Sequence, residues 1–422
     1  MMRRIVWAWA VVAGVAWGQT FLIRDVTVHP VAGPDIPATS VLVREGLVAE
    51  IAAKIPAPKG TKVIEGKGLH LYPGMIDSAT TLGLTEIGAV RETNDVAEIG
   101  DFNPQLRSLI AVNPSSEHIP VARANGITSA IALPNGGIIA GQVGLMHLDG
   151  WTWEDMDIKR SAALHLRFPV LTMAGGPGRG AGQRPTFAEA KRRHEEELQK
   201  LRLFFEDARR YQKAKVAAGP GFEVDRKLEA MLAVLEGKQQ VMVTAVRKRA
   251  IGEALEFAKR ENIKIVLAGC REFSPELLKD IKARNIPVIL PETLALPLDE
   301  DDPYDAIYAL PAELHRAGIL FAFATFDSSA VRNLPYQAAA SVPFGLERED
   351  ALKAVTINAA KIWGVDDKIG SVEKGKWADL VLADGDLLET KTQIKMMWIR
   401  GKPVDLESRH TKLADKYMAR PN

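Results

Sequence analysis

The sequence predicts an α/β protein, a (β/α)8 TIM barrel with a small composite β-sandwich domain built from both ends of the chain. The middle of the 422-residue chain alternates short apolar runs with helical patterns, which is typical of a parallel α/β fold. Both ends instead carry short strand-like runs separated by Pro, Gly and Asp at hairpin spacing. A chain of this length can bury one large core and a smaller second one.

Seven apolar runs are expected to form barrel strands, and the eighth strand is hidden between residues 140 and 170. The seven runs are Gly74–Leu82, Ile127–Leu133, Val170–Met173, Gln240–Val246, Ile263–Ala268, Ile286–Leu290 and Leu320–Ala324. Helices are expected between them at Lys248–Arg260, Ser274–Arg284 and Pro311–Ala317. The second of these begins with a serine N-cap, a first-turn proline and a first-turn acid. Seven visible strands favour a closed barrel over an open sheet.

The domain boundaries follow from the same patterns. The segments are 1–18 (signal peptide), 19–72 and 368–410 (small β-sandwich domain), 73–367 (barrel) and 411–422 (tail). Residues 175–218 interrupt the barrel with a glycine-rich loop and a long polar helix, expected over Thr186–Ala217, and are predicted to be an insertion at the barrel rim. Arg179 and Arg184 in the loop could close over an anion, but a plain rim lid is the more ordinary interpretation.

Composition excludes several classes of function. Lys and Arg number 54 against 53 Asp and Glu, so no overall field attracts nucleic acid. A single cysteine, Cys270, excludes an internal disulfide and a thiolate-rich metal site.

The first 18 residues have the pattern of a signal peptide. A basic start, Met1–Arg4, precedes an uncharged apolar run, Ile5–Trp17, and small residues flank Trp17 as signal peptidase requires. The run is short for a membrane span, so cleavage is expected rather than a retained anchor. The mature protein is therefore predicted to be exported, with no membrane association after cleavage, and in a bacterium to be periplasmic.

Three segments carry a resemblance to a known family. They are Gly68–Gly83, Asp327 after its strand, and the run from Thr356 to Val381, which includes Thr-Ile-Asn-Ala-Ala-Lys and Ile-Gly-Ser-Val-Glu-Lys-Gly-Lys-Trp-Ala-Asp-Leu-Val. Together they resemble the amidohydrolase superfamily, and the resemblance extends over nearly all of the mature chain. The sequence pattern is most similar to that of imidazolonepropionase-like amidohydrolases. The resemblance implies an amidohydrolase-like TIM barrel that hydrolyses non-peptide C–N bonds in cyclic amides, imidazolones or dipeptides through metal-activated water.

The same resemblance shows that the family's metal-binding histidines are absent from this sequence. The family's first strand reads P-G-[LMF]-I-D-x-H-x-H-x-G, and its two histidine positions hold Ala79 and Thr81 here. Thr244 and Gly269 stand where the family places histidines on the fifth and sixth strands. Of the usual ligands only Asp327 is matched, whereas catalytic zinc needs three protein ligands. The family implies a divalent metal, but the sequence predicts a degenerate metal site and leaves the cofactor open.

Asp327 is the candidate catalytic residue, either as a general base or as a structural cap of the residues that follow it. Thr81, Glu86, Thr244 and Cys270 are the candidate substrate-binding residues. Weak metal candidates are Asp327 itself with Asp95, Glu98 and Asp101, whose oxygens suit Ca²⁺ or Mg²⁺, against the ordinary interpretation of a solvated loop.

Among the eight histidines, only His147 and His165 are expected to approach the barrel, and His118 is expected to lie away from the strand ends. No pair has metal-ligand spacing.

Three functions stay open at this point: a C–N hydrolase with an altered site, a non-catalytic homologue that binds a small ligand in the barrel mouth, and a partner subunit of an intact amidohydrolase. Homo-oligomers are equally compatible with the sequence, and no nucleic-acid partner is expected. Fold alone does not decide among these functions.

Overall fold

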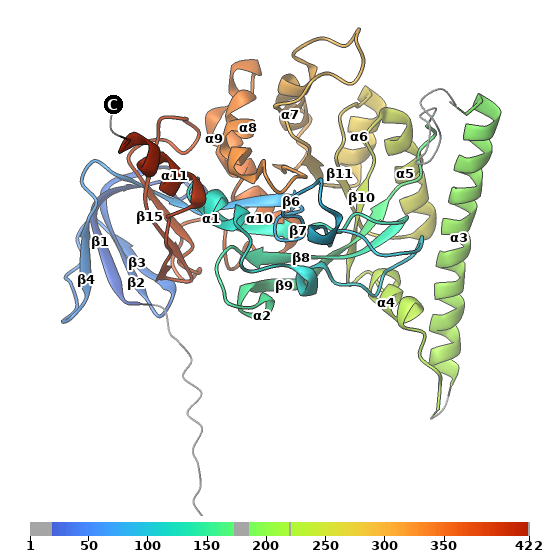
Figure 1. Cartoon of the computed structure of the whole chain (residues 1–422), viewed down its shortest axis with the longest axis horizontal. Helices are drawn as coiled ribbons and strands as arrows, with labels where there is room; N and C mark the ends of the chain where they lie inside the picture. Colours follow the sequence, from blue (N-terminus) through green and yellow to red (C-terminus); the bar gives the residue numbers. More distant parts are fainter. Residues whose placement is uncertain (1–18, 173–184, 219–220, 421–422) are drawn as a thin grey trace, which may run out of the picture.

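The computed structural model describes residues 19–172, 185–218 and 221–420 (Figure 1). The predicted signal peptide, residues 1–18, and the glycine-rich stretch with Arg179 and Arg184 lie outside these ranges. A small sheet occupies one end of the molecule, the barrel lies in the middle, and a long helix stands at the opposite edge (Figure 1). No helix in the described residues is both long and apolar enough to cross a membrane.

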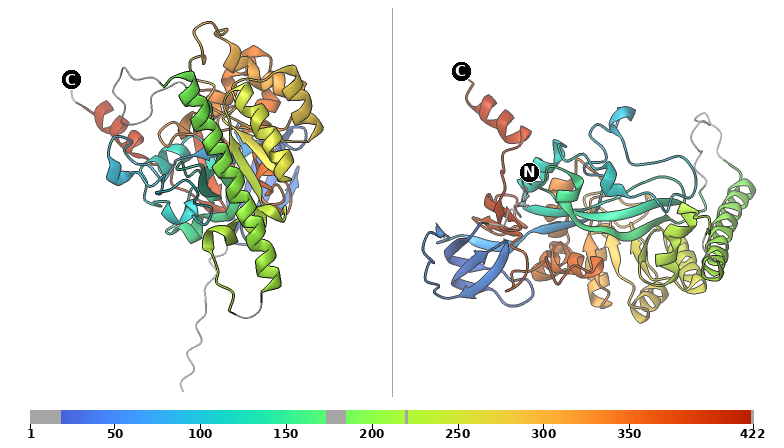
Figure 2. Two further views of the ribbon diagram at one scale, coloured as in Figure 1. Left: turned by 90° about the vertical axis from the view of Figure 1, so that its right-hand side faces the viewer. Right: turned by 90° about the horizontal axis from the view of Figure 1, so that it is seen from below.

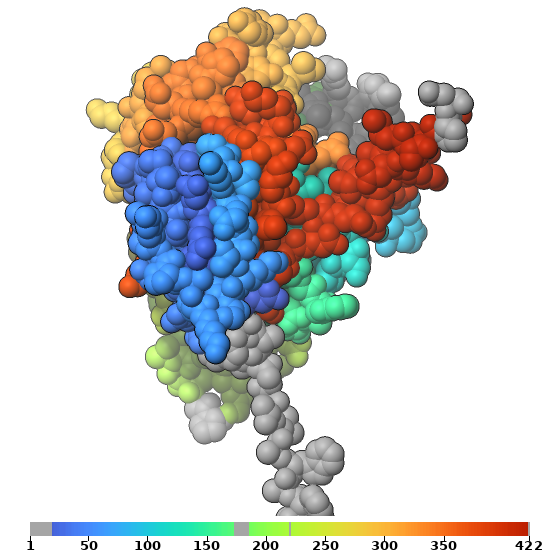
Figure 3. Space-filling model, turned by 90° about the vertical axis from the view of Figure 1, so that its left-hand side faces the viewer, coloured from blue at the N-terminus to red at the C-terminus, as the bar shows by residue number. Residues whose placement is uncertain are grey.

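The small sheet is assembled from both ends of the chain. Its strands are β1 (Phe21–Val28), β2 (Ile36–Arg44), β3 (Leu47–Ala52), β4 (Lys62–Glu65), β5 (His70–Pro73), β14 (Leu380–Ala383), β15 (Ile394–Ile399) and β16 (Lys402–Pro403). They form one continuous sheet in the order β16-β15-β14-β5-β1-β2-β3, with β4 also paired to β1. The two halves of the chain meet where β5 pairs with β14, and lie side by side in Figure 3. Phe21 stacks on Trp398 with ring centroids 4.9 Å apart, so the core of this sheet also draws on both ends.

The barrel wall is an eight-stranded sheet whose strands follow one another in chain order. They are β6 (Met75–Thr80), β7 (Ile127–Ala132), β8 (Ile139–His147), β9 (Asp157–Arg167), β10 (Gln240–Thr244), β11 (Ile265–Ala268), β12 (Val288–Leu290) and β13 (Phe321–Phe323). The predicted TIM-barrel architecture is confirmed, with one exception to its parallel order. Strand β8 runs antiparallel to both β7 and β9.

The stretch between residues 140 and 170 holds two strands, not one. The prediction of a strand at Val170–Met173 was wrong, because residues 168–172 lie in no strand and β9 has already ended at Arg167. Glycines weaken the strand pattern of β8. One of them, Gly144, is needed for packing, since a Cβ there would lie 2.3 Å from Cγ of Leu109.

Helices cover the outside of the barrel and one end of it. They are α1 (His118–Arg123), α2 (Trp153–Met156), α5 (Lys248–Glu261), α6 (Pro275–Ala283), α7 (Ala306–Arg316), α8 (Leu334–Ala340), α9 (Arg348–Ala354) and α10 (Ile357–Trp363), with short 3-10 turns η1 (Arg91–Thr93), η2 (Ser108–Ala111), η3 (Val331–Asn333) and η4 (Val342–Phe344). The predicted helices match α5 and α6, but α7 begins at Ala306, so Pro311 lies inside it. Gln240, at the start of β10, donates to the Ile362 carbonyl at 3.0 Å, which places α10 at the N-terminal end of the barrel.

The barrel interior is filled with apolar side chains. Inward residues of successive strands, among them Ile131, Met242, Val266 and Ile289, form one buried cluster that also includes Ala79. This filling is the usual one for a barrel of eight strands, which leaves no open channel. A ligand of the barrel itself must therefore bind at the mouth, where the parallel strands end.

The first and last strands of the barrel wall meet without a strand ladder, because the hydrogen-bonded order ends at β6 and β13. A few individual hydrogen bonds close this seam instead. The Asp77 carboxyl accepts hydrogen bonds from the Thr325 amide at 3.1 Å and the Thr325 hydroxyl at 2.5 Å. The Phe326 amide donates to the Ala79 carbonyl at 2.8 Å, and the Thr80 hydroxyl donates to the Asp327 carbonyl at 2.7 Å.

The predicted rim helix is present as α3 (Phe187–Ala217), followed by α4 (Arg226–Leu235). Thr186 and Glu189 form a capping box at its start, and its buried stripe includes Leu201 and Phe205. Phe205 packs edge-on against Phe257 of α5 with ring centroids 5.3 Å apart, so α3 lies along the side of the barrel (Figure 2, left).

Part of the predicted C-terminal tail is helical. Helix α11 (Arg409–Met418) has no buried residue and extends away from the body of the molecule (Figure 2, right).

Candidate functional site at the barrel mouth

Strands β6, β10, β11 and β13 bring the predicted site positions to the mouth. Thr244 ends β10 beside the end of β11, and a Cβ on Gly269 would lie 3.5 Å from its Cγ2 atom. Asp327 reaches the same end through its contact with Thr80 on β6. The structure therefore gathers Ala79, Thr81, Thr244, Gly269 and Asp327 at one end of the barrel, as the motif positions predict.

His165 on β9 reaches the mouth from the barrel wall. Its Nδ1 atom lies 2.7 Å from the Pro134 carbonyl, and its Nε2 atom lies 2.8 Å from the Thr244 hydroxyl. Burial lowers the pKa of His165 to about 4, against the opposing effect of the Pro134 hydrogen bond. The neutral ring donates from Nδ1 to the carbonyl and accepts from the threonine at Nε2. Both ring nitrogens are thus occupied by protein partners.

The Asp327 carboxylate acts as a cap for the residues that follow it. Its Oδ1 atom accepts hydrogen bonds from the Ser329 amide at 2.8 Å, the Ser329 hydroxyl at 2.7 Å and the Ala330 amide at 2.8 Å. Partial burial raises the pKa of Asp327, but these hydrogen bonds and the nearby His118 outweigh it and lower the pKa below the ordinary aspartate value. A carboxylate held in its charged form is a weak general base.

His118 lies close to the mouth, so the prediction that it lies away from the strand ends was wrong. Its Nε2 atom is 2.9 Å from the Glu86 carbonyl, in the loop that follows β6. The Glu86 carboxylate in turn accepts a hydrogen bond from the Asn113 amide at 3.3 Å. The sequence order hid this contact, because helix α1 returns over the first loop only in the folded chain.

Two other predicted residues lie away from the mouth. Cys270 is fully buried in the core between the barrel wall and its helices, where burial raises the pKa of its thiol. It cannot contact a ligand in the mouth in this conformation. His147 ends β8 at the opposite end of the barrel, where its Nε2 atom lies 2.7 Å from the Asp379 carboxylate.

The acidic loop after β6 does not converge on one point. Asp101 lies 3.3 Å from the ammonium of Lys200 on α3. Asp95 and Glu98 line a separate cleft of about 460 Å³ together with Arg107. The described residues contain no group of three or more His, Cys, Asp or Glu side chains placed to hold a metal ion.

Several known proteins are similar to this chain. Residues 226–404 match the model of the amidohydrolase family. An amidohydrolase structure from Thermotoga maritima covers 91% of this chain and 99% of its own, with 26% identity and a TM-score of 0.79. Over residues 226–404 the chain matches the amidohydrolase family, and its described fold is similar to that of an amidohydrolase.

Two further proteins are similar to this chain at lower sequence identity. A molinate hydrolase structure is 15% identical over 96% of this chain and 98% of its own, with a TM-score of 0.56. The amidohydrolase tasK of Hapsidospora irregularis is 24% identical over 94% of this chain. This chain spans 44% of the length of that relative.

The donor set at the mouth does not fit the metal that the amidohydrolase family implies. Ala79 and Gly269 offer no donor atom, and the neutral hydroxyls of Thr81 and Thr244 are poor zinc ligands. Both ring nitrogens of His165 are engaged in hydrogen bonds with protein groups. The Asp327 carboxylate accepts a hydrogen bond from the Ser329 amide. Binding zinc would require breaking these buried hydrogen bonds without supplying three ligands.

Proposed function

We propose that this amidohydrolase-family protein binds a small polar molecule at its barrel mouth and does not hydrolyse it through a histidine-bound metal. The observation that carries the proposal is the pair formed by His165 and Thr244, which fills the position of a metal ligand with a hydrogen bond between protein side chains. The metal site is degenerate on several strands at once, because Ala79, Thr81 and Gly269 also stand at histidine positions.

The remaining polar groups at the mouth suit binding better than catalysis. The Thr81 hydroxyl and the Glu86 carboxylate are partly exposed on the first loop. Asp327 presents an exposed carboxylate whose low pKa keeps it charged, so it can accept a hydrogen bond but holds a proton poorly. Such groups orient a ligand that carries N–H or O–H donors.

Metal analysis tests the central claim. Protein purified without chelators and then incubated with zinc or manganese is expected to retain substoichiometric metal after desalting, because the mouth offers fewer than three free ligands. Elemental analysis by mass spectrometry gives the measurement. About one equivalent of metal per chain that is lost on His165→Ala would contradict the proposal.

Hydrolysis of a C–N bond in a cyclic amide, imidazolone or dipeptide is the second candidate function. It is favoured by the position of Asp327 at the end of the last barrel strand, where the resemblance places a catalytic aspartate. If this candidate holds, Asp327→Asn is expected to reduce kcat by about 100-fold or more. The matched control Asp301→Asn removes an exposed carboxylate elsewhere. Unchanged turnover in Asp327→Asn would remove this aspartate from the chemistry.

Export and assembly are proposed on the sequence alone. The N-terminal 18 residues support cleavage and a periplasmic location. A chain without the metal clamp could also act as a partner subunit of an intact amidohydrolase or form homo-oligomers. Native mass measurement of the mature protein, alone and with such an enzyme, distinguishes these states.

A further inference from the structure

We infer that the cleft lined by Asp95, Glu98 and Arg107 is a binding site for a small zwitterion with an apolar side chain, such as an α-amino acid. The inference goes beyond the proposed function, because it holds whether or not the barrel mouth has lost hydrolysis. It assigns a ligand class to a cleft beside the mouth that no family motif marks.

The cleft is built from elements on the mouth side of the barrel. The loop after β6 forms one wall, and Pro134 after β7 with Ala140 at the start of β8 forms the other. Its volume of about 460 Å³ lies within the range of small-molecule sites.

Backbone hydrogen bonds hold these walls in place. The Asp95 amide donates to the Leu84 carbonyl at 2.7 Å, the Asn103 amide to the Ile139 carbonyl at 2.8 Å, and the Gln142 amide to the Leu106 carbonyl at 2.8 Å. The cleft is therefore formed before any ligand arrives, which reduces the ordering cost of binding.

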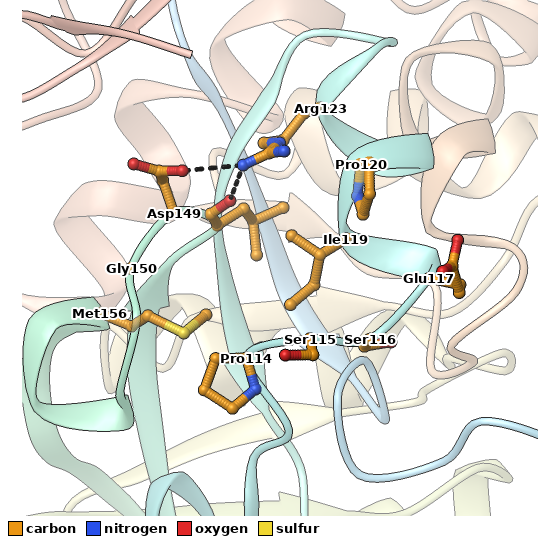
Figure 4. Close-up of a pocket in the computed structure, with 11 residues that line it drawn as sticks. Pro114, Ser115, Ser116, Glu117, Ile119, Pro120, Arg123, Asp149, Gly150 and Met156 are labelled. Atoms are coloured by element: carbon orange, nitrogen blue, oxygen red, sulfur yellow. Dashed lines mark hydrogen bonds and ion pairs between the residues drawn. The ribbon is translucent and has the colours of Figure 1, made fainter. Parts of the chain in front are cut away.

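Charges of both signs line the cleft without partners. Among the described residues, Arg107 makes no ion pair, and neither do Asp95 and Glu98. Another pocket shows the contrast. In the pocket of about 130 Å³ beside α1, Arg123 donates to the Asp149 carboxylate at 2.8 Å and to the Leu148 carbonyl at 3.2 Å (Figure 4). The arginine of that pocket is already paired with a carboxylate of the protein, whereas Arg107 is available.

Gln105 adds an observation that points to a ligand. Its Oε1 atom is buried and has no hydrogen-bond donor in the described structure, although Gln105 lines the cleft. A buried acceptor without a donor is costly, and an N–H group bound in the cleft would satisfy it if the Gln105 side chain turned its oxygen toward the ligand. An ammonium group can donate to this oxygen and to a carboxylate at the same time.

The rest of the lining is apolar. Val96, Leu106, Ala111 and Ala140 line the cleft, and the Ile110 side chain is 56% exposed beside them. An aliphatic side chain of the ligand would cover this surface.

The combination selects one class of ligand. The guanidinium of Arg107 can bind a carboxylate through two parallel hydrogen bonds. The acidic side chains and the Gln105 oxygen accept from an ammonium group. A phosphorylated ligand fits poorly, because two carboxylates share the cleft with a single arginine.

Titration calorimetry with three probes tests the assignment. L-leucine is expected to bind, whereas N-acetyl-L-leucine, which lacks the ammonium, and L-leucinamide, which lacks the carboxylate, bind about tenfold or more weakly. Arg107→Gln is expected to weaken L-leucine binding by a similar factor and to leave L-leucinamide unchanged. Glu98→Gln is expected to weaken the binding of L-leucine but not the binding of N-acetyl-L-leucine.

Arg91→Gln is the matched control, since Arg91 is an exposed arginine of the same loop outside the cleft. Equal affinity for all three probes, no detectable L-leucine binding, or an equal loss in Arg91→Gln and Arg107→Gln overturns the inference. Metal-dependent turnover of a C–N substrate together with intact L-leucine binding would contradict the proposed function and leave this inference standing.

Discussion

Replacing Asp379 with alanine is expected to destabilise the protein by about 3–5 kcal/mol, because it breaks a buried hydrogen-bonded pair and leaves its partner uncompensated. The Asp379 carboxylate lies 2.7 Å from Nε2 of His147 on β8, and its other oxygen accepts from the Arg400 amide at 2.7 Å. The side chains of Asp379 and His147 are 3% and 1% exposed. This one carboxylate joins the barrel wall to the small sheet.

Urea unfolding monitored by circular dichroism gives the measurement. Asp384→Ala is the matched control. Asp379 directly precedes β14 and Asp384 directly follows it, but Asp384 pairs with Lys395 at the surface, where ion pairs contribute little. In the Asp379→Ala variant, His147→Ala is expected to lower the free energy of unfolding much less than it does in the unmodified protein. The reason is that the pair is already broken. Similar losses in the Asp379 and Asp384 variants would refute this account.

The stability of the protein relative to its Asp77→Asn variant is expected to fall by about 1.4 kcal/mol per pH unit as pH rises from about 4 to about 7. Burial raises the pKa of Asp77 to about 7, although hydrogen bonds from Thr325 and Ala79 oppose the shift. In this window the folded protein keeps a proton on Asp77 that the unfolded chain releases. The stability due to this proton is complete below the unfolded pKa and is lost as pH approaches the folded pKa.

Asparagine imitates the protonated carboxyl at this seam. Its amide can donate to the Thr325 hydroxyl, which then donates to the Asp327 carbonyl 3.1 Å away, while its oxygen still accepts from the backbone. His165 acts in the opposite direction, since its lowered pKa makes stability fall as pH decreases from its unfolded value toward about 4. The comparison with Asp77→Asn cancels this second effect. Parallel stability profiles for the two proteins would show that Asp77 is ionised in the fold.

The fold could be predicted from sequence where local pattern and topology agree. Strands such as β10 and β11 are continuous apolar runs, and α6 carries its own start signals. Strand β8 escaped prediction because Gly141 and Gly144 interrupt its pattern, and their purpose lies in contacts with Leu106 and Leu109 far earlier in the chain. Nothing local to β8 reveals those neighbours.

The site was predictable in its positions but not in its contacts. The motif located Thr244 and Asp327 correctly at the mouth, while the hydrogen bond between Thr244 and His165 depends on the register of β9 against β10. Cys270 follows a strand, as a residue at the mouth would. The backbone turns at Gly269, with φ of 70°, and the Cys270 side chain is then buried in the core instead. Side-chain direction after a strand is a property of that turn.

The seam between β6 and β13 has a consequence for the dynamics of the barrel. Elsewhere in the wall, separating two strands breaks a ladder of backbone hydrogen bonds, but here only a few contacts around Asp77, Thr80 and Phe326 have to part. Local opening should therefore begin at this seam at a lower free energy than at any paired edge. Because the seam ends at Asp327, such an opening would alter the shape of the mouth before it disturbed the rest of the fold.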